Sequence, residues 1–286
     1  MFSDFIVPRK NRSRNSMRLL MAIGVLFFSL SALGQQQVDS SLSWAERWRA
    51  CKDSAAANNE TYRTGGIAAA YSGLQDTRMS PLIFRGMGVA LDVQRLSYGT
   101  KKLSDWQLKL TYIAGFSNRD QYSPMHLGRI DLNYAYQRKI PTKKGKLYLG
   151  AALNNLLNLR LYNPLGNNAF AMDYTLALSP KATWLLENIG KKNSMLLVSG
   201  GLSAVSFALR YPEFAYRGLE IQVLGMGRFN RYFFEIGWSP KLRYSNENRM
   251  YVAYLFDAYN FASSNDGKKV SQYVNSVKFA YFLKTK

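Results

Sequence analysis

The chain has 286 residues and a formal net charge of +20, from 38 Lys and Arg against 18 Asp and Glu. One His and one Cys exclude a His/Cys zinc site, a disulfide framework and an iron–sulfur centre, because each needs several such side chains at one point. An apolar content of 47% excludes a disordered chain. We therefore expect a folded protein with no metal and no cofactor. The charge predicts a polyanion nearby, either nucleic acid, phosphate-bearing lipid or a membrane surface.

The N-terminus has the layout of a secretory signal peptide. A basic stretch over 9–18 precedes an uncharged apolar run over 19–33, and small residues follow up to Gly34. The run has 15 residues, fewer than the roughly 20 that a spanning helix needs, so a retained membrane anchor is the alternative. We expect cleavage after Gly34, whether translation starts at Met1 or at Met17.

Removal of the predicted signal peptide, residues 1–34, leaves a basic chain. It takes away five basic residues and Asp4, so 33 basic and 17 acidic residues remain, with a net charge of +16. An exported chain meets no cytoplasmic nucleic acid. We therefore expect no nucleic-acid partner and predict that the polyanion is membrane lipid or lipopolysaccharide phosphate.

The rest of the chain alternates with a period of two. Over 106–117, large apolar side chains fall at even positions from Trp106 to Phe116, whereas Gln107 and Lys109 fall on the other side. This is the pattern of a strand with one apolar and one polar face. It predicts strands over 65–74, 85–98, 105–117, 127–140, 146–161, 169–187, 194–211, 218–228, 231–242, 249–260 and 270–284.

Most of these strands reach the roughly 9–11 residues that a tilted strand needs to cross a bilayer. With the signal peptide, they predict an all-β fold, a transmembrane antiparallel up-and-down barrel of about 12 strands (range 10–12). Eleven predicted strands conflict with the even number in bacterial single-chain barrels, so one is missed or miscounted. A soluble periplasmic β-sandwich that binds a polyanion is the alternative, because its strands would alternate too.

The segment before the strands does not alternate. Residues 35–63 include a helix-like stretch from Trp44 to Lys52. We predict an N-terminal periplasmic segment over 35–63, partly helical or irregular, and an outer-membrane barrel domain over 64–286.

Aromatic residues recur near the ends of the predicted strands. Such rings predict interfacial belts, because a ring tolerates hydrocarbon while its polar edge faces water. The alternative is that they fill a core, since aromatics are good strand formers. The set comprises Tyr98, Trp106, Phe116, Tyr148, Tyr162, Tyr211, Tyr232, Phe233, Trp238, Tyr244, Tyr251, Tyr259, Phe261, Tyr273 and Phe282.

The connections between strands fall into two groups. One group is rich in lysine and lies at 99–102, 141–146, 190–193 and 266–269; the other lies at 118–124, 162–168, 211–217 and 245–249. Successive hairpins would place each group at its own end of the barrel, so we predict one basic ring. Both orientations of the barrel in the membrane stay possible, because the strand count is odd.

Residues 73–86 resemble the signature of a family of uncharacterised outer-membrane barrels, in which an Asp-Thr-x-x-Ser-Pro-Leu turn joins the first two strands. The matching residues are Asp76-Thr77 and Ser80-Pro81-Leu82, while Arg78-Met79 stands where the family tends to carry Tyr-Leu. Looser matches lie at 167–169, 179–182, 207–216 and 254–259. The chain therefore resembles a divergent member over roughly 65–284. The resemblance implies an outer-membrane barrel and supplies no activity. From residue chemistry alone, Asp76, Thr77 and Ser80 predict a hairpin turn.

An enzymatic hypothesis depends on His126, the one imidazole in the chain. Ser123 lies three residues away with Pro124 between them, so the two side chains do not share one strand face. A catalytic triad would have to be completed across the fold. We predict no catalytic residue. The alternative is an outer-membrane enzyme that hydrolyses lipid or peptide through His126.

Charged side chains lie on the predicted inward faces of several strands. Mixed charges there predict ion pairs that fill a barrel lumen or line a pore, and a paired-acid hydrolase is the less simple reading. The sequence thus predicts an integral outer-membrane protein of a Gram-negative bacterium, with a structural, small-solute or surface-interaction role. The inward set comprises Asp92, Asp131, Glu220, Glu235, Lys109, Arg129 and Lys278.

Overall fold

A computed structural model describes residues 59–77, 79–119, 122–142, 145–162, 169–189, 194–211, 220–225, 229–240, 249–262 and 269–285. The predicted signal peptide, the helix-like stretch and the rest of the N-terminal segment up to residue 58 lie outside these ranges. Within them, no helix is long and apolar enough to cross a membrane.

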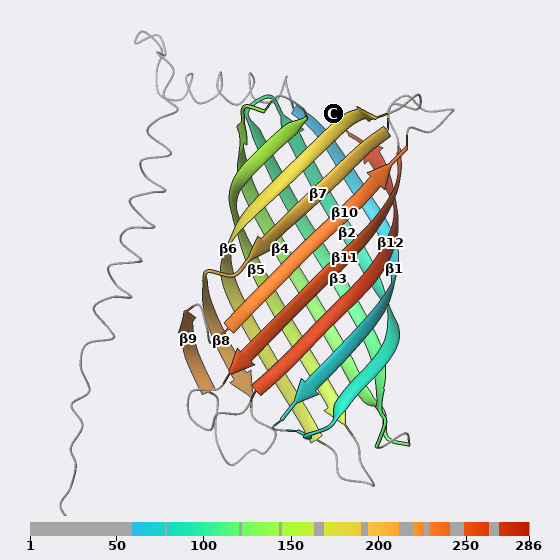
Figure 1. Cartoon of the computed structure of the whole chain (residues 1–286), viewed down its shortest axis with the longest axis vertical. Helices are drawn as coiled ribbons and strands as arrows, with labels where there is room; N and C mark the ends of the chain where they lie inside the picture. Colours follow the sequence, from blue (N-terminus) through green and yellow to red (C-terminus); the bar gives the residue numbers. More distant parts are fainter. Residues whose placement is uncertain are drawn as a thin grey trace, which may run out of the picture. The chain divides into compact units, whose positions relative to one another are not determined.

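The described residues form twelve strands, which join in one antiparallel sheet (Figure 1). Ten of the eleven predicted strands have one observed counterpart whose ends lie within six residues of the prediction, and the strand predicted over 194–211 is divided into two. The strands are β1 (Asn59–Asp76), β2 (Ile83–Gly99), β3 (Lys102–Ser117), β4 (Met125–Ile140), β5 (Lys146–Tyr162), β6 (Ala169–Ile189), β7 (Ser194–Leu202), β8 (Val205–Tyr211), β9 (Glu220–Gly225), β10 (Phe229–Ser239), β11 (Arg249–Ala262) and β12 (Lys269–Lys284).

The sheet closes on itself into a barrel. The order around the wall is β5-β4-β3-β2-β1-β12-β11-β10-β7-β6, and pairing between β5 and β6 completes the circle. Ten strands therefore close the wall, within the predicted range of 10–12. The prediction of an all-β antiparallel barrel is confirmed, and the alternative of a sandwich of two sheets is wrong.

Two passes of the chain through the wall are interrupted. β7 and β8 both pair with β6, and residues 203–204 separate them. β10 pairs with β7 while β9 pairs with β8, so β9 and β10 run in the same direction. The two strands predicted over 218–228 and 231–242 therefore belong to one pass, and their prediction as separate passes is wrong. Counted as one, they turn the eleven predicted strands into ten passes, an even number.

Both ends of the described chain lie at one end of the barrel, here called the terminal end. The amide of Thr285 donates to the carbonyl of Thr61, at 2.8 Å. The opposite end, called the distal end, holds Asp76 and the first residue of β12, Lys269. The lysine-rich connection at 266–269 therefore leads to the distal end, and the connection from β10 to β11 belongs to the terminal end. The prediction that 266–269 lies at the same end as the other lysine-rich connections, and 245–249 at the opposite end, is wrong. Counting one pass as two reverses the end assigned to every later turn.

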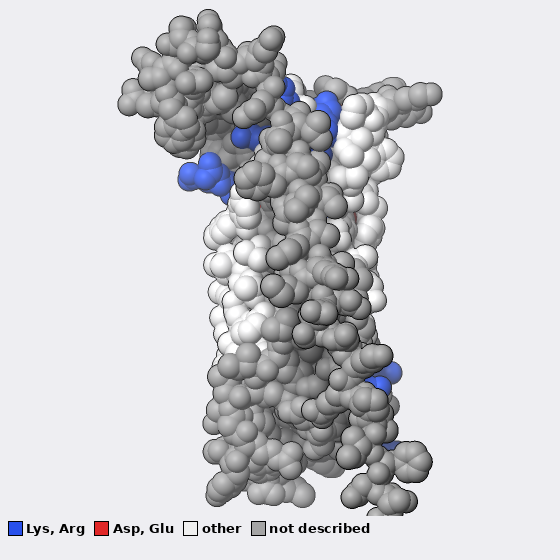
Figure 2. Space-filling model, turned by 90° about the vertical axis from the view of Figure 1, so that its left-hand side faces the viewer, with Lys and Arg blue, Asp and Glu red and all other residues white. Residues whose placement is uncertain are grey.

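The outer face of the wall is apolar between two charged margins. Large side chains are widely exposed there, including Met87 at 74% and Val89 at 64%. In Figure 2, the described surface visible between the grey atoms is almost entirely white between basic residues near the two ends. The outward Lys and Arg side chains of the described strands lie near strand ends: Arg63, Arg85, Arg95, Lys102, Arg138 and Lys269.

The aromatic residues predicted as belts divide between the two faces of the wall. Trp106, Phe116, Tyr232 and Trp238 are exposed on the outer face. Seven members of the set are buried in the interior, so their prediction as interfacial rings is wrong: Tyr98, Tyr148, Tyr162, Tyr251, Tyr259, Phe261 and Phe282. A position near a strand end does not decide the face, because successive residues point to opposite faces. The side chains of Tyr211 and Tyr244 are outside the described residues.

Candidate functional site

The carboxylates on the described strands point into the barrel. Asp92 and Asp131 are 1% and 2% exposed, and Glu235 accepts a hydrogen bond from the Tyr251 hydroxyl at 2.7 Å. A buried charge is tolerated only where it is paired or hydrogen-bonded. The strand pattern places these side chains inward as predicted, together with Lys109, Arg129 and Lys278; the side chain of Glu220 is outside the described set.

Two arginines and two aspartates form a charge tetrad in the middle of the lumen: Arg129 and Asp131 on β4, Arg231 on β10 and Asp257 on β11. Arg129 Nε lies 2.6 Å from Asp131 Oδ2, and Arg129 also pairs with Asp257. Arg231 Nη2 lies 2.7 Å from Asp131 Oδ1 and 2.6 Å from Asp257 Oδ2. Four strands separate β4 from β11 in either direction around the wall. The tetrad therefore joins opposite sides of the barrel.

Two further ion pairs flank the tetrad on the side of the terminal end. The Lys278 ammonium of β12 pairs with Asp92 of β2, and Lys181 Nζ of β6 lies 2.8 Å from Asp105 Oδ2 of β3. Gln94 links the two pairs, because its Nε2 donates to Asp105 at 2.9 Å while its Oε1 accepts from Lys278 at 3.2 Å. These contacts join β12, β2, β3 and β6.

Arg160 of β5 organises the charged network towards the distal end. Its guanidinium is fully buried, pairs with Asp173 of β6, and lies 3.1 Å from Asp76 Oδ2 of β1. The hydroxyl of Tyr259 on β11 accepts from Arg160 Nη1 at 3.2 Å and from Asn158 Nδ2 at 3.0 Å. Arg160 thus connects β5 with β6, β1 and β11.

A cavity of about 60 Å³ remains within the network, lined by Gln107, Lys109, Lys181, Arg231 and Glu235 among others. A water molecule needs roughly 10–15 Å³ of such volume and two to four polar partners. Arg231 Nη1 is buried and has no hydrogen-bond partner in the described part of the chain. The cavity is thus suited to a few water molecules that would satisfy such groups.

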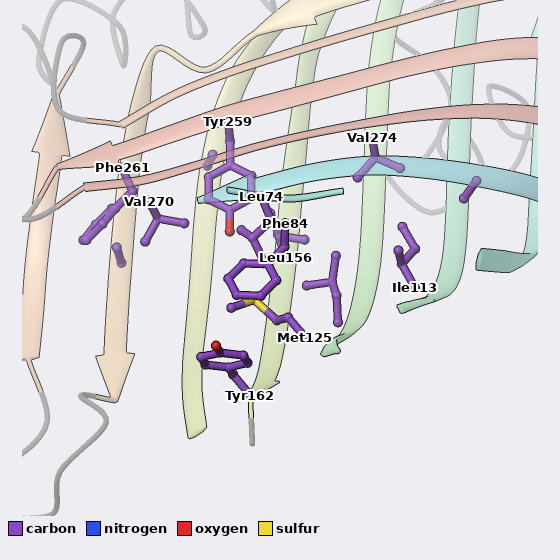
Figure 3. Packing of buried hydrophobic residues seen from close by; sticks show 14 residues of the cluster. Leu74, Phe84, Ile113, Met125, Leu156, Tyr162, Tyr259, Phe261, Val270 and Val274 are labelled. Carbon is purple, nitrogen blue, oxygen red and sulfur yellow. The ribbon is translucent and has the colours of Figure 1, made fainter. Parts of the chain in front are cut away.

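Apolar side chains pack into the lumen on both sides of the network. Near the distal end, Figure 3 shows Phe84, Met125 and Leu156 between the rings of Tyr259 and Tyr162. The rings of Phe84 and Tyr162 meet edge to face, with their centroids 4.9 Å apart. Near the terminal end, a second cluster contains Tyr62, Tyr98, Tyr148, Tyr251 and Phe282, and the rings of Tyr62 and Tyr98 stack at 5.9 Å. Seven of the fifteen aromatic residues predicted as belts therefore fill the interior of the barrel instead.

His126 does not join the charged network. It lies on β4 at an outward position, whereas Arg129 and Asp131 of the same strand point inward. Its Nδ1 lies 2.7 Å from the hydroxyl of Tyr112, which is itself 51% exposed on the outer face. The structure therefore does not bring His126 together with the luminal carboxylates.

The Asp76–Ser80 segment forms the hairpin turn that its residues predict. The amides of Met79 and Ser80 donate to the carbonyl of Asp76, at 3.1 and 2.9 Å. Thr77 ties the turn to β12, because its Oγ1 donates to the carbonyl of Lys269 at 3.1 Å and accepts from the Lys269 amide at 2.9 Å. The turn thereby holds the buried Asp76 carboxylate beside Arg160.

The charged luminal residues that the sequence pattern missed include Arg160, Arg231 and Asp257. Arg160 and Arg231 follow the same alternation as their neighbours, so strand parity alone would have placed them inside. Their partners lie on strands far away in the sequence, and no local signal identifies them. Chemically, the network holds opposite walls together and fills the lumen.

No protein-family model and no curated protein matches the chain. Among solved structures, the translocator domain of the autotransporter NalP from Neisseria meningitidis aligns over 83% of this chain and 94% of its own, with 10% identity and a TM-score of 0.41. The outer membrane protease OmpT from Escherichia coli aligns over 79% and 96%, with 8% identity and a TM-score of 0.42. The outer membrane protein OprG from Pseudomonas aeruginosa aligns over 79% and 96%, with 14% identity and a TM-score of 0.26. Similarity this low assigns no activity.

Proposed function

We propose that this chain is an integral β-barrel of the outer membrane of a Gram-negative bacterium, with a filled interior and a structural or surface-interaction role. The apolar outer face of the wall carries the proposal. Contiguous exposed apolar patches on soluble monomers rarely exceed a few hundred Å², whereas here exposed large apolar side chains occur on each of the ten strands of the wall. Hydrocarbon around the wall would remove the cost of that exposure.

The polar groups of the outer face also suit a lipid environment. Asn155 and Asn275 sit at outward positions, and their amide oxygens accept hydrogen bonds from Tyr174 at 2.9 Å and from Tyr254 at 2.5 Å. A polar group in hydrocarbon has no water to bond, so a partner on the neighbouring strand lowers the cost of placing it there. A closed wall has no free sheet edge, which is the second requirement for strands in lipid.

The filled lumen favours a structural or interaction role over an open diffusion pore. Barrels of about eight strands are narrow enough for ordinary side chains to fill, while porins of 16–18 strands leave a channel. Here ten strands enclose the Arg129–Asp257 tetrad and two apolar clusters. Small-solute passage would require these groups to move apart.

The lengths of the connections favour one orientation. Outer-membrane barrels have short periplasmic turns and longer extracellular loops. Three of the four connections at the terminal end have five residues or fewer, whereas all five at the distal end have six or more. We therefore place the terminal end, with most of the lysine-rich turns, in the periplasm.

The enzymatic alternative has less support. His126 faces outward beside Tyr112, and the inward aspartates are engaged in ion pairs. A general base needs its partner within hydrogen-bond reach, and no described contact links His126 to a carboxylate or a serine.

Fractionation and conductance together test the proposed function. The full chain should remain in outer membranes after washing with urea at alkaline pH, and the folded barrel should migrate faster than the boiled protein on a denaturing gel. In planar bilayers it should show no steady open channel. Recovery in the soluble periplasm would overturn the membrane assignment. Stable conductance from the purified protein would overturn only the filled interior.

A further inference from the structure

Four outward side chains line up across β1 to β4 near the terminal end. Arg63 of β1 is the direct neighbour of Arg95 on β2, which is the neighbour of Trp106 on β3, which in turn pairs with Tyr134 on β4. All four are exposed. All four line a groove of about 650 Å³, to which Val93 and Asp105 also contribute.

Two arginines in direct register create an electrostatic problem. Like charges directly opposite on adjacent strands destabilise a sheet. The one carboxylate among the described residues that line the groove, Asp105, is already paired with Lys181 at 2.8 Å. Neither guanidinium has an ion-pair partner in the part of the chain that the structure describes. A ligand that brings negative charge would relieve the repulsion between Arg63 and Arg95.

More positive charge lies beside this row. Lys102 of β3 and Arg138 of β4 are also direct neighbours on the outer face. They sit four residues from Trp106 and Tyr134 along their strands, which is about 13 Å towards the terminal end. Four cations therefore share one sector of the outer face, on the side of the apolar band that lies towards the terminal end.

The chemistry of the row matches a lipid phosphate. Guanidinium groups bind phosphate through two parallel hydrogen bonds, and Trp and Tyr gather where apolar and aqueous regions of a membrane meet. Directly below Arg95, β2 continues with Val93, Leu91 and Val89, which are 51%, 57% and 64% exposed. An acyl chain attached to a phosphate at Arg63 and Arg95 would lie along this apolar strip.

We propose that Arg63 and Arg95 bind the phosphate of a glycerophospholipid headgroup, with Trp106 and Tyr134 beside the headgroup and the acyl chains along Val89–Val93. The site rests on the proposed membrane insertion and on its orientation, which place this row in the periplasmic leaflet. The lipid class is an anionic phospholipid, because two cations meet at one position.

Native mass spectrometry of the detergent-purified full chain tests the site, with dimyristoylphosphatidylglycerol as the added lipid and dimyristoylphosphatidylcholine as the comparison. We expect one phosphatidylglycerol to bind preferentially and the variant R63Q/R95Q to bind it at least ten-fold more weakly. Arg85→Gln is the matched control, because Arg85 is an exposed outward arginine of the same β2 strand near the distal end; its binding should equal that of the unmodified chain. R63K/R95K should fall between them, since it keeps the charge and loses the paired hydrogen bonds.

Equal lipid binding by R63Q/R95Q and the unmodified chain would overturn the site. Full competition by inorganic phosphate at millimolar concentration would also overturn it, in favour of a free-phosphate site. Folding of each variant is checked by its faster gel mobility before boiling. A variant that stays in the membrane without a change in lipid binding refutes this site alone, whereas loss of the unmodified chain from the membrane fraction refutes the proposed function.

Discussion

Arg129 and Asp257 form an ion pair between β4 and β11, which stand on opposite sides of the barrel. Backbone hydrogen bonds join only neighbouring strands, so a contact of this kind adds a connection that the sheet cannot supply. Arg231 lies within 2.7 Å of both aspartates of the tetrad. Long arginine side chains reach across a lumen wider than that of a small eight-stranded barrel.

Asp257→Asn should destabilise the folded barrel strongly. Arg129 and Arg231 would then share one carboxylate, Asp131, and breaking a buried ion pair by removing one partner costs about 3–5 kcal/mol. Urea titration of the protein in lipid vesicles, followed by gel mobility without boiling, measures the change. Asn260→Ala is the control on the same strand, because Asn260 is exposed on the outer face, and its effect should stay within about 0.5 kcal/mol. Equal midpoints for the two variants would contradict a stabilising tetrad.

Gly86→Ala should impair assembly of the β2–β3 pair. A Cβ at Gly86 would lie 1.8 Å from the carbonyl oxygen of Ala114 and 2.4 Å from Gly115 Cα, so the backbone of β3 would have to move. Overpacking of this kind costs about 1–3 kcal/mol. Gly65→Ala on adjacent β1 is the control, because no atom lies within 4 Å of a Cβ there. The fraction of protein that folds into vesicles should fall for Gly86→Ala alone; equal yields would show that the strands tolerate the shift.

The wall was largely predictable because alternation is a local property of each strand. The inward positions of Asp92, Arg129 and Lys278 follow directly from the parity of their neighbours, and the structure confirms them. Gly86 and Gly88 lie within β2 where the backbone of β3 comes close. That approach depends on the twist of two paired strands, which a single segment does not encode.

Closure of the wall was not predictable in the same way. Leu224 lies in β9, which pairs with β8, and Phe234 lies in β10, which pairs with β7. Only these pairings show that the two segments belong to one pass. The error reversed the assignment of later turns and left Lys269 at the wrong end. The cross-lumen partners of Arg160 were hidden for a related reason, since only the curvature of the closed sheet brings Asp76 and Tyr259 to it.

Thr77→Val should weaken the first hairpin and its link to β12 while keeping the shape of the side chain. Two hydrogen bonds to Lys269 would be lost, each with a net value of about 0.5–1.5 kcal/mol. Hydrogen exchange measured by mass spectrometry should show faster exchange in the peptide that contains Lys269. Thr77→Ser keeps both bonds and should restore slow exchange. Unchanged exchange in Thr77→Val would mean that backbone bonds suffice to hold the turn, namely those to the Asp76 carbonyl and the bond from the Thr77 amide to the Lys269 carbonyl at 3.0 Å.

Tyr259→Phe separates hydrogen bonding from packing in the interior. The ring of Tyr259 would still fill its place between Leu156 and its neighbours, but Arg160 Nη1 and Asn158 Nδ2 would each lose an acceptor. A buried donor left without a partner costs about 1–3 kcal/mol, so the urea midpoint in vesicles should fall. Tyr232→Phe is the control, because Tyr232 is 48% exposed on the outer face and should leave the midpoint nearly unchanged. If both variants behaved alike, water inside the lumen would be replacing the hydroxyl, and the network around Arg160 would hold the barrel less tightly than its geometry indicates.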